Sequence, residues 1–207
     1  YFPAGSSFVA LAPGRLLESR VGEASTVDGL FWKIGQRSTG SVTQLVVNGR
    51  GRVAADAAAV VLNVTVTGPA RAGYLTVYPC DATRPLAASN LNYSAGQTIA
   101  NTVTSKVSAD GKVCIYTSGP THLIADINGY FPAGSSFVAL APGRLLETRV
   151  GEASTVDGLF WKIGQRSTGS VTQLVVNGRG GVDADAAAVV LNVTVTGLAG
   201  AGYLTVY

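Results

Sequence analysis

Charged residues, methionine and histidine are scarce in this chain of 207 residues. Charged side chains make up 13% of it, about half of the roughly 25% found in an average soluble protein. There is no methionine, and His122 is the one histidine. The net charge of +3 comes without any run of lysine or arginine, which argues against nucleic acid as a partner. No apolar run reaches the roughly 18 residues that suggest a membrane-spanning helix, so we expect no membrane span.

Cysteine is limited to Cys80 and Cys114. Two cysteines and one histidine cannot supply the four ligands of a structural zinc site. The acidic residues lack the spacing of a calcium loop, and the 26 glycines do not form a phosphate-binding loop. We therefore expect neither a metal nor a cofactor. In a secreted chain the two cysteines favour a disulfide, which would close a loop of about 34 residues and contribute roughly 3–4 kcal/mol; two buried free thiols are the alternative.

One stretch of the sequence occurs twice. Residues 1–17 return unchanged from Tyr130 onward, and the offset of 129 residues holds to the last residue, Tyr207. We call residues 1–78 segment A, residues 79–129 segment B and residues 130–207 segment A′. Segments A and A′ differ at five positions, which are Ser19/Thr148, Arg52/Gly181, Ala54/Asp183, Pro69/Leu198 and Arg71/Gly200.

This repeat predicts the domain organisation. Residues 1–129 are expected to form one complete unit, A plus B, because about 129 residues suffice to bury a core. Residues 130–207 are expected to be a partial second repeat that a neighbouring unit or chain completes. The chain starts inside the repeat and without methionine, so we expect it to be a fragment or a processed product.

Alternation of apolar and polar residues predicts an all-β fold. The clearest strand is 58–67, in which Leu62 and Val64 alternate with Asn63 and Thr65, a period typical of a half-buried antiparallel strand. Further strands are expected at 7–12, 15–21, 30–34, 42–47, 74–78, 87–93, 98–107, 112–117 and 121–128, with a turn at Pro13-Gly14 and a hairpin turn at Asp110-Gly111. Short strands without a helical pattern predict an antiparallel β-sandwich or jelly roll, repeated in tandem.

The junction between the repeats is short. Phe137 is the counterpart of Phe8 and belongs to the first expected strand of A′, and only six residues separate it from Tyr130. A connection this short and stiffened by proline is not a flexible tether. It predicts that successive units are held close and in a fixed orientation.

A compact charged cluster is the first candidate site. Arg15, Glu18 and Arg20 lie within six residues of a chain that is otherwise poor in charge. The planar forks of the arginines suit a carboxylate or a sugar acid. An internal ion-pair network that ties the first strand to its sheet is the interpretation we favour. The same cluster recurs in A′ as Arg144, Glu147 and Arg149.

Aromatic side chains are the second candidate site. Trp32 and its copy Trp161 could stack against a sugar, although a Phe-Trp pair within a short strand is more often part of the core. Tyr74 and Tyr78 share one face of their strand, which the pattern predicts to be the more exposed face.

The only histidine is the remaining candidate for chemistry. His122 and Asp126 are expected on one face of the last strand, where they could orient Ser118 or Thr121 as a nucleophile. The sequence around them is that of an ordinary strand and has no nucleophile elbow. We therefore expect that the protein is not an enzyme.

Several phrases carry a resemblance to a known kind of domain: Phe8–Arg20, Val60–Gly68, Gly73–Cys80, Ser89–Tyr93 and His122–Phe131. Together they resemble a secreted repeat domain of actinobacterial and related bacterial surface proteins. The usual first phrase ends Leu-Leu-Asp-Thr-Arg, whereas this chain has Glu-Ser-Arg and Glu-Thr-Arg. The resemblance implies an extracellular location and tandem arrays, and it supplies no catalytic residues.

These observations predict an extracellular structural or adhesive protein. Segment B can complete a fold with A or with A′, so the other segment must find a B in a neighbouring unit or chain. Such strand complementation would give head-to-tail self-association and a surface stalk or filament. The alternative is a module that binds carbohydrate or cell-wall polysaccharide.

Overall fold

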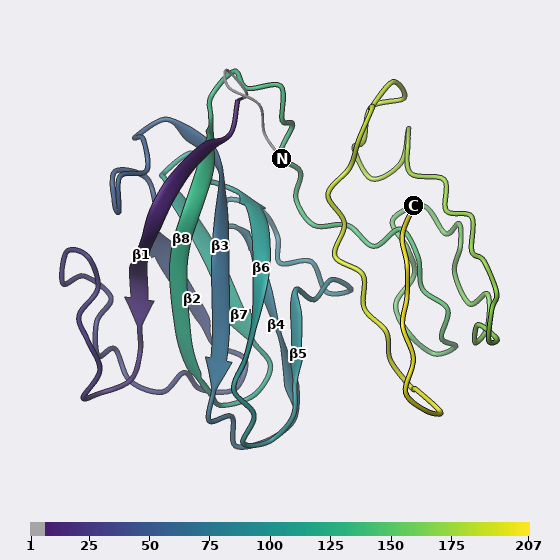
Figure 1. The fold of residues 1–207 in the computed structure, drawn as a ribbon, viewed down its shortest axis with the longest axis horizontal. Coiled ribbons are helices and arrows are strands. Elements are labelled where there is room, and N and C mark those ends of the chain that lie inside the picture. Colours follow the sequence, from purple (N-terminus) through teal and green to yellow (C-terminus); the bar gives the residue numbers. More distant parts are fainter. Residues whose placement is uncertain (1–6) are drawn as a thin grey trace.

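The computed structural model describes residues 7–207 and has eight strands in two four-stranded antiparallel sheets (Figure 1). The strands are β1 (Val9–Glu18), β2 (Val42–Val46), β3 (Ala57–Thr67), β4 (Gly73–Pro79), β5 (Leu91–Tyr93), β6 (Ile99–Lys106), β7 (Lys112–Thr117) and β8 (His122–Pro132). One sheet has the order β1-β8-β3-β6 and the other β2-β7-β4-β5. The predicted all-β, antiparallel two-sheet architecture is thus confirmed, and residues 7–207 contain no helix long and apolar enough to cross a membrane.

The core lies between the two sheets and follows the predicted alternation. On β3, Leu62 and Val64 are fully buried, whereas Asn63 and Thr65 are half-buried. Leu123, Ala125 and Ile127 of β8 point into the same core. The inward residues of both sheets form a single hydrophobic cluster, which is what a sandwich requires.

Segments A and B alternate strictly across both sheets. β1, β2 and β3 come from A, as does β4 up to its last residue, Pro79; β5 to β8 come from B, and β8 continues to Pro132. β1 pairs with β8, β2 with β7, β3 with both β6 and β8, and β4 with both β5 and β7. In the described part of the chain, every named ladder therefore joins an A strand to a B strand.

Beyond Pro132, where β8 ends, segment A′ has no such partner and no strand. From residue 133 to residue 207 the chain runs as extended pieces and turns beside the sandwich (Figure 1). The one bridge within this stretch joins Glu147 to Trp161, as Glu18 is joined to Trp32 in A. A′ contacts the sandwich through Asn192, which donates to Ser89 O (2.7 Å) and accepts from Asn101 (3.1 Å).

The expected turn at Pro13-Gly14 is wrong, because one strand passes straight through it. β1 advances four residues from Ala10 to Gly14, while β8 moves two, from Gly129 to Ile127. This bulge absorbs the extra residues. Proline is tolerated there because β1 is an edge strand that pairs only with β8.

The expected strand at residues 30–34 is also wrong. Phe31 and Lys33 both have φ of 57°, a left-handed conformation that a strand cannot contain. The stretch is a tight loop whose only ladder contact is the bridge from Trp32 to Glu18.

Asp110-Gly111 forms a turn, but the expected hairpin is wrong. Gly111 has φ of 76°, and the Ser108 amide donates to Lys112 O at 3.0 Å. The flanking strands β6 and β7 lie in different sheets, so the turn carries the chain from one layer to the other. A turn signal specifies local geometry, and it does not specify which strands pair.

The expected strand at 87–93 shortens to β5, Leu91–Tyr93. The side chain of Asn90 accepts from the Val77 amide at 2.7 Å, and Thr76 Oγ1 donates to Ala88 O at 2.7 Å. The Asn90 amide still donates to Leu75 O at 2.8 Å, and before it side-chain hydrogen bonds take the place of a regular ladder.

Candidate functional site: the charged clusters and the interface between segments

The cluster at the end of β1 surrounds one buried carboxylate. Glu18 has no exposed surface, and Arg20 meets both of its oxygens, through Nε at 2.9 Å and Nη2 at 2.8 Å. Arg15 donates to Glu18 at 2.9 Å and to Asp126 of β8 at 3.0 Å. Burial by itself would raise the pKa of Glu18, but the hydrogen bonds and positive charge of Arg20, with the charge of Arg15, hold that pKa below its usual value. The guanidinium groups of Arg15 and Arg20 donate to carboxylates of the same chain, which supports an internal network that ties β1 to β8.

The same cluster exists in A′ without segment B. Arg149 donates to Glu147 at 2.8 Å and Arg144 donates at 2.5 Å. The Arg149 guanidinium holds the pKa of Glu147 below its usual value. All three residues lie within a few positions of one another, so the cluster forms locally.

Both tryptophans are held by neighbours in the chain. Trp32 Nε1 donates to Glu23 O at 3.1 Å, and Lys33 Nζ lies 3.6 Å from the ring centroid. Trp161 Nε1 donates to Glu152 O at 3.2 Å, and Lys162 lies 3.7 Å from its ring. Because a lysine covers the ring in each copy, neither tryptophan offers an open stacking face on that side.

The tyrosines lie on the second sheet. Tyr74 contacts Tyr116 with 5.8 Å between ring centroids, and the Arg84 guanidinium lies 4.0 Å from the Tyr116 ring. Burial raises the pKa of Tyr78 and of Tyr116. Leu75 and Val77 on the opposite face of β4 are fully buried in the core, whereas Tyr74 is half-buried and Tyr78 is 5% exposed. The two tyrosines therefore lie on the less buried face, as expected, although Tyr78 itself is nearly covered.

His122 contacts a serine of segment A. Its Nδ1 lies 3.0 Å from Ser19 Oγ, which also accepts from the Leu123 amide at 2.8 Å. Asp126 binds Arg15 instead, and Ser118 Oγ accepts from the Tyr74 amide at 2.8 Å. Neither of these potential triad partners hydrogen-bonds to His122, and the contact to Ser19 serves to join A to B.

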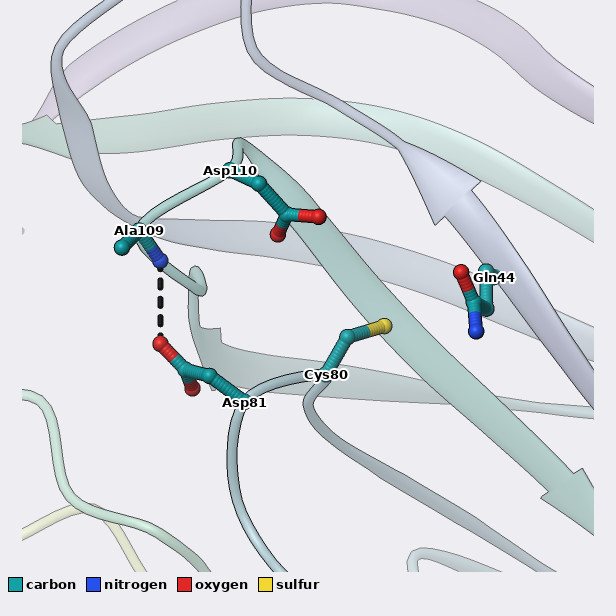
Figure 2. Close-up of a pocket in the computed structure, with 5 residues that line it drawn as sticks. All are labelled: Gln44, Cys80, Asp81, Ala109 and Asp110. Atoms are coloured by element: carbon teal, nitrogen blue, oxygen red, sulfur yellow. Dashed lines mark hydrogen bonds between the residues drawn. The ribbon is translucent and has the colours of Figure 1, made fainter.

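The predicted disulfide between Cys80 and Cys114 is present, with an S–S distance of 2.13 Å. It joins the residue after β4 to the middle of β7 and borders a shallow hollow of about 260 Å³ (Figure 2). Both carboxylates of this hollow are engaged: Asp81 accepts from the Ala109 amide at 3.0 Å, and Asp110 pairs with Lys112 at 2.7 Å. Across residues 7–207 no group of three or more histidine, cysteine or acidic residues is placed to hold a metal.

Arg50 is a key residue that the sequence analysis missed. It is 6% exposed and donates to Leu16 O at 3.0 Å, to Val46 O at 2.8 Å and to Asp28 at 2.7 Å. The Arg50 hydrogen bond also lowers the pKa of Asp28. Its copy Arg179 makes the equivalent contacts in A′. An arginine that recurs in a chain poor in charge was the sequence feature that could have identified this buried residue.

The A′ counterpart of the core is an uncovered apolar surface. Val60, Leu62, Val64 and Val66 of β3 are fully buried. Their counterparts are 38% (Val189), 40% (Leu191), 48% (Val193) and 52% (Val195) exposed. The counterparts of buried Leu75 and Val77 in β4 are Leu204 and Val206, which are 54% and 66% exposed. A surface that B covers in A is therefore open in A′.

Comparison of the chain with protein-family models, curated proteins and solved structures finds no match. The interface between A and B, and its absence in A′, therefore carry the functional conclusion.

Proposed function

We propose that this protein is an extracellular structural or adhesive protein of a bacterial surface, in which sandwich units stand in tandem as a stalk or filament and are linked by strand complementation. The strict alternation of A and B strands carries this proposal. Each A-type segment needs a B-type segment for every ladder it makes, and B is followed directly by another A-type segment. A contact of this kind is open and head-to-tail, so it can continue from unit to unit.

The junction between the repeats suits a stiff stalk. β8 ends at Pro132, and the Phe131 ring stacks on Phe137 with 4.2 Å between centroids and 22° between planes. Phe131 also contacts Phe8 at 5.2 Å. Ser7 Oγ lies 3.0 Å from Ser136 Oγ, its own counterpart in A′. The beginnings of A and A′ therefore meet at the end of one strand, and these contacts support a fixed orientation of A′ against the preceding unit.

Composition and chemistry agree with an extracellular location. The disulfide is stable in an oxidising compartment. A low content of charge, 13%, suits a protein built of many β strands with serine, threonine and asparagine on the surface.

Electron microscopy of the native material, with light scattering of the purified chain, tests this function. We expect a periodic filament in the native material. Exchange of B between copies of residues 1–207 leaves the number of ladders unchanged, so we expect oligomers of the purified chain only at high concentration. Phe137→Ala removes the aromatic stack on Phe131 and should loosen the angle between successive units, whereas Phe8→Ala, the matched variant, should also weaken β1. Isolated beads in native material, with a chain that stays monomeric at every concentration, would contradict the proposal.

A further inference from the structure

The geometry points to A′ as a vacant acceptor for a second B-type segment, a polypeptide with the sequence of residues 79–132 that is not already paired. This inference rests on the proposed function and names the partner that A′ takes. The segment would fold onto A′ as residues 79–132 fold onto A, supplying strands equivalent to β5, β6, β7 and β8.

The acceptor surface is already complete in sequence. None of the five differences between A and A′ lies within β1, β2, β3 or β4. Residues 138–147 repeat β1, residues 171–175 repeat β2, residues 186–196 repeat β3, and residues 202–207 repeat all of β4 but its final proline. Each side chain through which A's strands meet B is therefore present a second time.

The loops of A′ are already organised. Arg179 is 7% exposed and binds Asp157 at 2.6 Å and Leu145 O at 2.9 Å, as Arg50 binds Asp28 and Leu16 O in A. Glu147 is joined to Trp161 by the same bridge that joins Glu18 to Trp32. Fewer groups must be ordered when a segment binds, and preorganisation of this kind favours affinity.

An unpaired segment is a better partner than another complete copy. Residues 1–207 contain two A-type segments and one B. When two copies exchange B, one set of ladders breaks for each set that forms. A free segment adds a new set without breaking one, and it covers the exposed apolar row from Val189 to Val195.

Two of the five differences change a side chain that hydrogen-bonds to segment B. Arg71, which donates to Ser118 O at 3.1 Å, is Gly200 in A′, and Ser19 is Thr148. Ser19 is fully buried, and its hydroxyl meets His122 and the Leu123 amide. Thr148 keeps the hydroxyl and adds a methyl group, which a fully packed site accommodates poorly. A′ should therefore bind a B-type segment more weakly than A does, and Thr148→Ser should tighten binding to A′.

Titration of the full chain with a synthetic segment of residues 79–132, oxidised at its two cysteines, tests the inference. We expect a complex of one segment with one chain, and new protection of residues 186–196 from hydrogen exchange. Val193→Asp in the chain should weaken binding roughly 100-fold or more, because the complex would bury an unpaired charge. Val193 is 48% exposed without the segment, so this variant leaves the free chain folded.

A covalent version keeps the test decisive if the segment is poorly soluble. In this version, a second copy of residues 79–132 is fused directly after Tyr207. Tyr207 then precedes the added segment as Tyr78 precedes Pro79 in the chain. Amides of residues 186–196 should then exchange as slowly as those of 57–67.

Two results would overturn the inference. One is that the segment does not bind and residues 186–196 exchange fast in the joined chain. The other is that Val193→Asp leaves binding unchanged. A chain that forms filaments without accepting the segment overturns the inference alone, and acceptance of the segment with isolated beads in native material overturns the function alone.

Discussion

Segments A and A′ are nearly the same sequence, and only A forms a sandwich. The contrast separates two kinds of structure. The Arg–Glu clusters, the tryptophan loops and the buried arginines at 50 and 179 occur in both copies, since each joins residues at most 34 positions apart. The strands occur only in A, because each of their ladders needs a partner from B. Sheet formation in this chain is therefore a property of a pair of segments.

The largest expected difference between the copies comes from a charge in the core. Val64→Asp places a carboxylate at a fully buried site and should lower the free energy of unfolding by about 4 kcal/mol or more. Val193→Asp, the same change in A′, should alter it by less than about 0.5 kcal/mol. Urea unfolding followed by tryptophan fluorescence measures both, and equal losses in the two variants would refute the contrast.

The disulfide should stabilise A and B together and leave A′ unaffected. Replacing Cys80 and Cys114 with serine removes a cross-link between positions 34 apart, which should cost about 3–4 kcal/mol. Hydrogen exchange of residues 57–67 should accelerate, while exchange of residues 138–207 stays as it is. Faster exchange in both regions would mean that A′ depends on the folded unit.

Acid should weaken the unit through Glu18. Its pKa is lowered in the folded state, so the stabilisation it gives is complete above its ordinary value near 4.5 and is lost as pH falls below that value. Glu18→Gln should cost about 2 kcal/mol at pH 7 and reduce the dependence of stability on pH below 4.5. Glu147→Gln is the matched control and should leave global unfolding unchanged. An unaltered pH profile for the Glu18 variant would show that other carboxylates govern acid unfolding.

The smallest effect is expected at the buried difference between the copies. Ser19→Thr should destabilise the unit by about 1 kcal/mol, because the added methyl group must fit beside His122 and Leu123. Thr148→Ser should leave the free chain unchanged. Thermal unfolding of both variants measures this, and a stabilising Ser19→Thr would show that the site has room for the methyl group.

Much of the fold could be predicted from the sequence, because β3, β7 and β8 have a clear alternation of apolar and polar residues. Predictions failed where local signals conflicted with tertiary context. Pro13-Gly14 reads as a turn, but the bulge in edge strand β1 absorbs it. The run at 30–34 is apolar enough for a strand, but the left-handed Phe31 and Lys33 exclude one.

The candidate site could be predicted only in part. The disulfide could be predicted because the chain has two cysteines. The charged cluster could be predicted because three charged residues lie close together in a chain that is poor in charge. Pairing of His122 with Ser19 was not visible, because 103 positions separate them. Burial of Arg50 depended on the three backbone segments that converge on it.

The sequence by itself determined the repeat, the β class and the local charged clusters, because these depend on residues that are close in the chain. The tertiary structure alone decided which copy forms strands. A and A′ have the same propensities, but a β strand satisfies its backbone hydrogen bonds only through a neighbouring strand. Here B pairs with A, so the extended segments of A become sheets and those of A′ stay open.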